Sequence, residues 1–331
     1  MTIKSKVFVT RRLPEAGLKL IKDGCDAEVW PDQMPPPAAV LRQRVADCDG
    51  LVSLLTDAID GPFLDKAPRL KVVSNFAVGF NNIDVSACTA RGICVGNTPG
   101  VLNDATADMA FALLITAARR IVEGHQYTLS GQWKTWEPLG HLGQDLAGRN
   151  IGIVGMGRIG YALAQRCRGG WNMNVLYHDV YKSEKAEKDL GARQVDIDTL
   201  LKESDFVSVH TDLNEKTRGM FNAAVFRKMK PTAVFINTAR GPIVNQRDLH
   251  DALKQGVIFA AGLDVTDPEP PEMTDPLLQL NNCVIAPHIA SATVCTRDAM
   301  AEICASNLIA GLTGEKLQAW VNPEVEAQRR K

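Results

Sequence analysis

The stretch IGIVGMGRIG, residues 151–160, joins a short apolar run to three glycines in the pattern G-x-G-x-x-G, and a helical pattern, RIGYALAQRC, overlaps its end. This order predicts a strand, a tight turn and a helix. In such a turn Gly155 makes the bend, Gly157 lets the backbone approach a pyrophosphate, and Gly160 packs the helix against the strand. The N–H groups of the first helical residues, Arg158 and Ile159, remain free to bind phosphate. The stretch therefore predicts a dinucleotide-binding fold.

Asp179 ends the next predicted strand, 24 residues after Gly155. A carboxylate at this position accepts hydrogen bonds from the adenosine ribose hydroxyls and repels a 2′-phosphate. We therefore expect NAD (NADH) as the cofactor and consider NADP the less favoured one. A tight βα turn followed by a solvated acidic strand end remains the ordinary alternative.

Short β-branched runs alternate with helical patterns along the whole chain, which is typical of parallel α/β architecture. The first hundred residues contain predicted strands at 6–10, 50–54, 71–75 and 93–96. A second series has predicted strands at 151–155, 174–179, 205–210, 233–238, 259–265 and 283–288. Two long helices are predicted near 103–123 and 291–312, where the chain passes between the two series.

The second series has enough strands for a complete dinucleotide fold, and the last helix is left over. One domain inserted into the other is the economical arrangement. Residues 1–100 and 289–331 then form the first domain, and residues 101–288 form the dinucleotide-binding domain. The predicted fold class is α/β, with two Rossmann-like or flavodoxin-like lobes that each contain a parallel sheet.

Composition excludes several classes of protein. Hydrophobic residues make up 45% of the chain, charged residues 23%, and the formal net charge is −1, which argues against a nucleic-acid partner. The most apolar segment, Met109–Ala118, is too short to cross a bilayer, and no signal-peptide pattern is visible, so we expect a cytoplasmic protein. The eight cysteines form no CxxC pair, so we expect reduced thiols and no metal site.

Three ionisable residues follow successive predicted strands of the second series: Arg240, Glu269 and His288. The carboxyl ends of parallel strands meet at one crevice, where ligands bind. Histidine is suited to proton transfer near neutral pH, a neighbouring carboxylate orients the ring and favours its protonated form, and arginine grips a carboxylate in a fork. Taken singly, each has an ordinary interpretation as a core histidine, a surface ion-pair partner or a loop charge.

Six motifs together resemble the D-isomer-specific 2-hydroxyacid dehydrogenases. Within that family, the segments NTPGVLNDATAD (97–108) and TWEPLG (135–140) most resemble the glyoxylate/hydroxypyruvate reductases (glycerate dehydrogenases). The motifs are NFAVGFNNID (75–84), NTPGVLNDATAD (97–108), GMGRIG (155–160), INTARGPIVNQRDL (236–249), GLDVTDPEP (262–270) and APHIASAT (286–293). The resemblance covers essentially the whole chain. It implies NADH-dependent reduction of a small 2-keto acid by an oxidoreductase, with residues 1–100 and 289–331 as the substrate domain.

The resemblance also implies roles for individual residues. His288 is the acid/base, Glu269 its partner and Arg240 the substrate anchor. The substrate-binding positions are Leu54, Val78, Gly79, Trp136, Arg240 and His288. The cofactor-binding positions are Thr106, Gly155, Gly157, Arg158, Ile159, Gly160, Asp179, His210, Thr211, Asp212, Thr217, Thr238, Ala239, Arg240, Asp264, His288 and Ala290. Without the resemblance, residues 77–81 read as a glycine turn, Thr106 as an ordinary helical residue and Asp264 as a strand-end acid.

Two positions depart from the family pattern. Thr211 and Asp212 replace the usual apolar residue and proline after His210, so that Asp212 is expected near the adenosine pocket. It would either bond a ribose hydroxyl or add to the rejection of a 2′-phosphate. Ala290 replaces a glycine and adds a methyl group near the nicotinamide, for which we expect mild tightening of the pocket.

Trp133 and Trp136 lie in the segment GQWKTWEPLG, residues 131–140. In related reductases this arm crosses to the partner subunit, and a tryptophan from it borders the partner's substrate site. The resemblance thus implies a homodimer in which Trp136 has that position. An ordinary buried or surface aromatic is the alternative.

Two other functions share these motifs. A dehydrogenase of the same architecture could act on phosphite, phosphoglycerate, a sugar-derived 2-keto acid or another D-2-hydroxy acid. An NAD-sensing corepressor-like binding module could also keep the cofactor site and the three ionisable residues. Turnover of NADH with glyoxylate or hydroxypyruvate separates the enzyme from the module.

Overall fold

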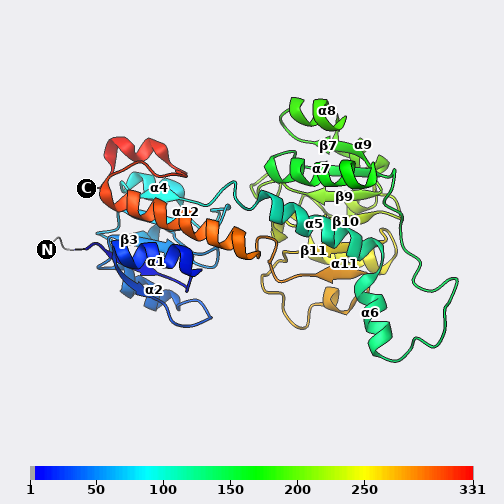
Figure 1. Cartoon of the computed structure of the whole chain (residues 1–331), viewed down its shortest axis with the longest axis horizontal. Coiled ribbons are helices and arrows are strands. Elements are labelled where there is room, and N and C mark those ends of the chain that lie inside the picture. The colour runs from blue at the N-terminus through cyan, green and yellow to red at the C-terminus, as the bar shows by residue number, and fades with distance from the viewer. Residues whose placement is uncertain (1–3, 331) are drawn as a thin grey trace. The chain divides into compact units, whose positions relative to one another are not determined.

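The computed structural model describes residues 4–330, which fold into two compact units. Unit 1 lies within Met1–Leu102 and Ala292–Lys331, and unit 2 is Asn103–Ser291 (Figure 1). The first residue range of unit 1 therefore ends two positions later than the expected boundary at residue 100, and its second range begins three positions later than residue 289.

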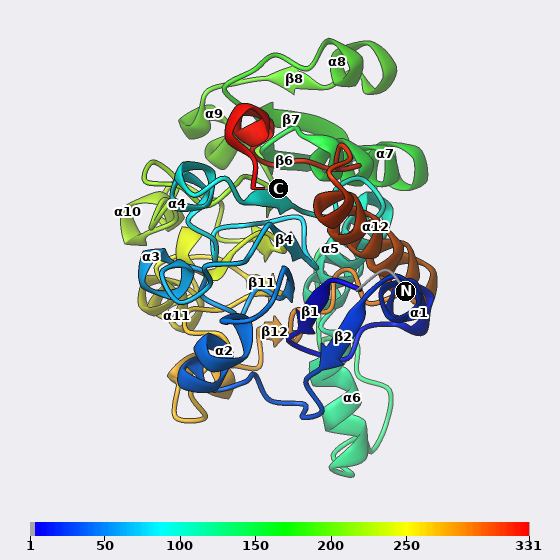
Figure 2. The same cartoon turned by 90° about the vertical axis from the view of Figure 1, so that its left-hand side faces the viewer.

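Unit 1 is a five-stranded parallel sheet in the order β2-β1-β3-β4-β5. Its strands are β1 (Lys6–Val9), β2 (Asp26–Val29), β3 (Gly50–Ser53), β4 (Val72–Asn75) and β5 (Cys94–Gly96). Its helices are α1 (Glu15–Gly24), α2 (Ala38–Val45), α3 (Gly61–Leu64), α4 (Val85–Ala90) and α12 (Val294–Thr313), followed by the 3₁₀ turn η3 (Pro323–Gln328). α1 lies beside α12, as Figure 2 shows.

Unit 2 is a seven-stranded parallel sheet in the order β12-β11-β10-β9-β6-β7-β8. Its strands are β6 (Asn150–Val154), β7 (Asn174–His178), β8 (Arg193–Gln194), β9 (Phe206–Val209), β10 (Val234–Asn237), β11 (Ala260–Leu263) and β12 (Cys283–Ile285). Its helices are α5 (Asn103–Ala118), α6 (Ile121–Leu129), α7 (Arg158–Trp171), α8 (Glu184–Leu190), α9 (Ile197–Glu203), α10 (Ala223–Phe226) and α11 (Gln246–Lys254), with 3₁₀ turns η1 (Gly241–Ile243) and η2 (Pro276–Gln279).

Two apolar cores cover the two faces of the unit 2 sheet. Side chains alternate along each strand: Ile153 and Ile236 belong to one core, which includes α5 and α7. Val154 follows Ile153 and Phe235 precedes Ile236, and both belong to the other core, which includes α9 and α11. A parallel sheet that is covered on both faces favours apolar residues on both faces of each strand, and this explains the mostly apolar runs in the sequence. The predicted α/β class with two parallel sheets is confirmed.

The prediction of one helix over residues 103–123 is wrong. The chain forms α5 and α6, separated at Arg119 and Arg120, and Arg120 has a left-handed φ of 53°. The Arg120 guanidinium donates to both carboxylate oxygens of Glu123, one turn into α6, at 2.8 and 2.6 Å. This local pair stabilises the break, and a periodicity argument does not detect it.

Further structural features bear on the expectations from composition. All eight cysteines are free thiols, and six of them are buried. Within residues 4–330, no helix is long and apolar enough to cross a membrane. The same residues contain no group of three or more histidine, cysteine or acidic side chains placed to hold a metal ion.

Candidate functional site

The turn between β6 and α7 has the conformation that its glycines predict. Gly155 has a φ of +96°, and a Cβ there would lie 2.7 Å from the carbonyl oxygen of His210. A Cβ at Gly160 would lie 2.2 Å from the carbonyl oxygen of Gly155. Both positions thus require glycine for reasons within the protein itself.

Gly157 is different, because a Cβ there would meet no atom within 4 Å and its φ of −73° suits any residue. Gly157 is the exposed N-cap of α7, and no side chain caps the helix. Within the described residues, the first α7 N–H to donate to a backbone carbonyl is that of Tyr161, which donates to Gly157. The N–H groups of Arg158, Ile159 and Gly160 are therefore available at the positive end of the helix dipole. These features fit a bound pyrophosphate.

Asp179 directly follows β7 and lies beside the glycine turn. One of its oxygens accepts a hydrogen bond from the N–H of Met156 at 2.7 Å, and the other accepts one from the N–H of Tyr181 at 3.0 Å. The carboxylate is therefore held against the turn by backbone donors. Each oxygen keeps a second lone pair for a further hydrogen bond.

His210 directly follows β9, the strand that pairs with β6 on the side away from β7. Its Nε2 lies 2.8 Å from the hydroxyl of Ser208, and burial of the ring lowers the pKa of His210 to about 4. The ring is thus neutral at physiological pH and cannot offer a positive charge to phosphate. Thr217 closes the loop that follows, because its hydroxyl donates to the carbonyl oxygen of Asp212 at 2.7 Å.

The three predicted catalytic residues follow three strands that are neighbours in the sheet, β10, β11 and β12. Arg240 comes after β10, Glu269 after β11 and His288 after β12. Nδ1 of His288 and Oε1 of Glu269 form a hydrogen bond. Because Nδ1 faces Glu269, Nε2 is left as the atom that exchanges a proton with a ligand. The exposed fractions of the side chains, 28% for His288 and 40% for Glu269, leave the pair accessible.

Asp264 fixes the loop that carries His288. Its carboxylate accepts hydrogen bonds from the N–H groups of Ile289 and Ala290, both at 2.8 Å, and its carbonyl oxygen accepts one from the N–H of His288 at 2.9 Å. These bonds hold His288 in a left-handed conformation, with φ of 53°. Burial raises the pKa of Asp264, while the two N–H donors and the nearby His288 oppose the rise.

Arg240 lies within the electrostatic reach of two carboxylates. Burial lowers the pKa of its guanidinium, and Glu269 and Asp212 oppose that shift. The sequence placed Asp212 near adenosine and gave no sign that its charge would act on Arg240. Asp212 follows β9 and Arg240 follows β10, and these strands are adjacent in the sheet. The strand order is therefore the information that is needed to place the two charges near each other.

The remaining expected cofactor positions also lie in unit 2. Thr106 is buried in the first turns of α5, and Thr238 and Ala239 connect β10 to Arg240. The hydroxyl of Thr238 is a buried polar group without a hydrogen-bond partner among the described residues. Such a group is the kind that a bound polar ligand satisfies.

The other expected substrate positions lie elsewhere. Leu54 follows β3, and Val78 and Gly79 follow β4, all in unit 1. Trp136 belongs to the segment after α6 in unit 2, and its exposed fraction is 81%. The structure therefore brings together Arg240, Glu269 and His288 within unit 2.

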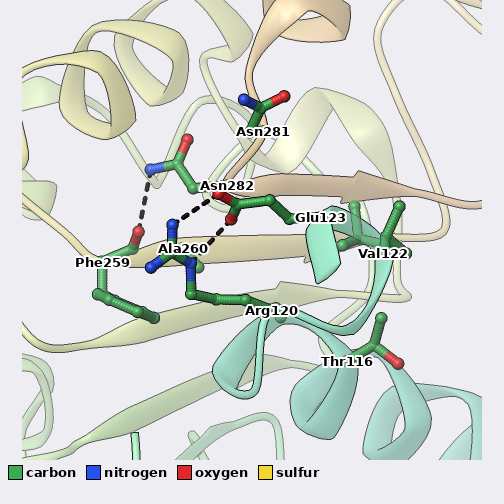
Figure 3. Close-up of a pocket in the computed structure, with 10 residues that line it drawn as sticks. Thr116, Arg120, Val122, Glu123, Phe259, Ala260, Asn281 and Asn282 are labelled. Carbon is green, nitrogen blue, oxygen red and sulfur yellow. Dashed lines mark hydrogen bonds and ion pairs between the residues drawn. The ribbon is translucent and has the colours of Figure 1, made fainter. Parts of the chain in front are cut away.

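A cavity of about 400 Å³ lies where the strands of the unit 2 sheet begin, at the end opposite to the one that carries Arg240, Glu269 and His288. Phe259 and Asn282, which directly precede β11 and β12, line it together with Arg120 and Glu123 of the break between α5 and α6 (Figure 3). Figure 3 shows the charges of Arg120 and Glu123 paired with each other, and the Asn282 amide bonded to the Phe259 carbonyl. The cavity contains none of the predicted site residues.

The model of the family described as "D-isomer specific 2-hydroxyacid dehydrogenase, NAD binding domain" matches residues 111–290. A glyoxylate reductase of Korarchaeum cryptofilum is 51% identical over 98% of this chain and 97% of its own length. A crystal structure of a Thermus thermophilus protein superposes with a TM-score of 0.90 at 43% identity, covering 96% of this chain and 99% of that one.

The NADPH-dependent glyoxylate/hydroxypyruvate reductase of Sinorhizobium meliloti, solved with NADP and malonate, superposes with a TM-score of 0.85 at 30% identity over 99% of both chains. These likenesses extend over both units. The chain is therefore an oxidoreductase that belongs to the D-isomer-specific 2-hydroxyacid dehydrogenase family.

Proposed function

We propose that this chain reduces a small 2-keto acid of the glyoxylate or hydroxypyruvate type to the D-2-hydroxy acid, with NADH as the reductant. The strongest support is the hydrogen-bonded pair of His288 and Glu269. These residues follow the two strands that come next in the sheet after the one before Arg240, and the same sheet also carries the glycine turn. Relatives that are named glyoxylate reductases support the substrate class.

The side chains divide the chemistry as follows. NADH, held at the turn formed by Gly155, Gly157 and Gly160, would supply the hydride for the keto carbon. Protonated His288 donates a proton from Nε2 to the keto oxygen, while Glu269 accepts the Nδ1 hydrogen bond and fixes the ring. The Arg240 guanidinium binds the substrate carboxylate and polarises the keto group. In the reverse direction, neutral His288 takes the hydroxyl proton.

Recognition of the substrate rests on a small set of side chains and backbone groups in this proposal. Arg240 and His288 bind the carboxylate and the carbonyl oxygen, and the family resemblance adds Leu54 and the backbone N–H groups of Val78 and Gly79. Glyoxylate has one carboxylate and one carbonyl oxygen, and hydroxypyruvate has one hydroxyl group more. A guanidinium, an imidazole and a few N–H donors satisfy the polar atoms that the two acids share.

Selection of NADH over NADPH rests on Asp179 in this proposal. Its carboxylate is held beside the glycine turn by two N–H groups, and a 2′-phosphate would meet its negative charge. The Sinorhizobium meliloti relative is named as NADPH-dependent, so the fold by itself does not select NADH.

We further propose that the protein is a homodimer. α6 has no buried residue, and the segment that follows it leaves four large apolar side chains exposed. These are Trp133, Trp136, Leu139 and Leu142, with exposed fractions between 58% and 81%. Large apolar side chains that are exposed so close together in the sequence are typical of a protein interface.

A panel of 2-keto acids, each assayed with NADH and with NADPH, tests the function. We expect the highest kcat/KM with glyoxylate or hydroxypyruvate and NADH. His288→Ala should abolish reduction yet leave the dissociation constant for NADH nearly unchanged, because the proton donor is lost and the glycine turn is intact. Wild-type turnover in this variant would eliminate His288 as the acid, and absence of turnover with every acid would favour a binding module.

A further inference from the structure

The loop after β4 contains three successive peptide groups whose carbonyl oxygens are all bonded. The Ala77 oxygen accepts a hydrogen bond from the N–H of Thr98 at 2.8 Å. The Val78 oxygen accepts one from the side-chain amide of Asn97, also at 2.8 Å. The Gly79 oxygen accepts one from the side-chain amide of Asn75 at 2.9 Å.

These three acceptors determine where the N–H groups of the same peptides point. The peptide bonds concerned are trans, so each N–H lies opposite its carbonyl. The donors Asn75, Asn97 and Thr98 come from the ends of the adjacent strands β4 and β5. The N–H groups of Val78, Gly79 and Phe80 therefore point away from these strand ends. None of them donates to a backbone acceptor in residues 4–330.

The two asparagine side chains are themselves part of a fixed framework. Asn75 is fully buried, and its amide oxygen accepts a hydrogen bond from the hydroxyl of Ser53 at 2.9 Å. The carbonyl oxygen of Asn97 accepts one from the side chain of Asn307 on α12 at 2.9 Å. Asn82 ties the neighbouring loop to the same framework, because its amide donates to the carbonyl oxygens of Leu54 and Asp57, both at 3.0 Å.

We propose that Asn97 and Asn75 are positioning residues, which hold the N–H groups of Val78, Gly79 and Phe80 as a cradle for the substrate carboxylate. The N–H of Phe80 is a third donor, besides the two that the family resemblance implies. This inference rests on the proposed function, since it assumes a 2-keto acid as the ligand. Three successive N–H groups on one side of a loop are a known form of anion site.

The side-chain amide donor at residue 97 is the group to alter, because Asn97 is half-buried and its replacement is tolerated better than that of Asn75. Asn97→Asp is isosteric but replaces the N–H donor by an acceptor that faces the Val78 oxygen. We expect the KM for the keto acid to rise about tenfold, with kcat within about twofold of wild type. The dissociation constant for NADH should not change, because Asn97 lies outside the glycine turn.

The pH profile distinguishes positioning from general loosening. The carboxyl group that Asn97→Asp introduces can donate to the Val78 oxygen once it is protonated, so the KM of this variant, relative to wild type at the same pH, should fall as the pH is lowered. Asn97→Ala should show the raised KM without this recovery. Asn322→Ala is the matched control, because Asn322 is a buried asparagine of unit 1 that bonds the backbone of Ile93 and Val95 and lies outside the loop.

Binding of oxalate, observed through backbone ¹⁵N–¹H signals of the labelled wild-type protein, tests the cradle without turnover. The signals of Val78, Gly79 and Phe80 should shift with oxalate, and Asn97→Asp should need about tenfold more oxalate for the same shift. Unchanged signals in the wild type, or equal KM values for wild type and Asn97→Asp, overturn the inference. If no keto acid is turned over but these signals shift, the cradle stands and the proposed reaction fails.

Discussion

Positions 157 and 160 of the glycine turn require glycine for different reasons. Gly160→Ala places a Cβ 2.2 Å from a backbone oxygen, and we expect it to lower the free energy of unfolding by about 1–3 kcal/mol. Gly157→Ala meets no protein atom and should change stability by less than about 0.5 kcal/mol. It should nevertheless weaken NADH binding at least about tenfold, since the methyl group enters the space of the pyrophosphate. Denaturant unfolding and NADH titration of both variants test this, and tight NADH binding by Gly157→Ala would contradict the assignment.

Asp179 offers a second residue-scale prediction. Asp179→Ala removes the negative charge beside the glycine turn, so the ratio of kcat/KM for NADH to that for NADPH should fall at least about tenfold. Asp179→Asn retains an acceptor oxygen and loses the charge, and it separates repulsion of the 2′-phosphate from hydrogen bonding to ribose. If the ratio does not move in either variant, cofactor selection lies elsewhere, and Asp212 is the next residue to alter.

The place of a residue in the fold could be predicted from the sequence wherever a motif puts that residue in a turn or at the end of a strand. The glycine turn and the ends of β10, β11 and β12 are of this kind. The reach of Asp212 to Arg240 and the bonding of Asn97 to the Val78 carbonyl were not accessible. Both depend on which strands lie side by side, and hydrophobic periodicity does not carry that information.

At the scale of elements, the buried and mostly apolar strands were predicted, and the edge strands β2 and β8 were missed. β2 is only half-buried, with the sequence DAEV, and β8 has two residues, Arg193 and Gln194. Edge strands need neither apolar faces nor length, because only one side pairs. The break at Arg120 was missed for the converse reason, since good helix formers continue through it.

The contact between α1 and α12 is close enough to be tested with one methyl group. A Cβ at Gly17 would lie 2.2 Å from the carbonyl oxygen of Ala301 on α12. We expect Gly17→Ala to destabilise the protein by about 1–3 kcal/mol, because the helices must separate. Gly169→Ala in α7 is the control: nothing lies within 4 Å, and alanine in a helix should be neutral or stabilising. Equal thermal midpoints for the two variants would show that the helices do not pack as described.

At the scale of the whole molecule, the proposed homodimer would account for the exposed apolar side chains after α6. A chain with a globular composition rarely leaves two tryptophans and two leucines exposed within ten residues of sequence unless a partner covers them, and residues 133–142 do so. The arm and the position of Trp136 were expected from the family resemblance, whereas the exposed fractions of the four apolar side chains come from the structure.

Two substitutions in this segment separate assembly from substrate recognition. Leu139→Glu places a charge on the exposed apolar surface and should shift the protein from dimer to monomer in sedimentation equilibrium, since an unpaired charge in an interface is costly. Trp136→Ala should retain the dimer but change the ratio of kcat/KM between glyoxylate and the larger hydroxypyruvate by about threefold or more, because a tryptophan from the partner would then no longer border the site. Lys134→Ala, in the same segment, is the control for the fold of the arm. An unchanged substrate ratio in a dimeric Trp136→Ala protein would remove Trp136 from the site, whereas a monomeric wild-type protein would remove the dimer itself.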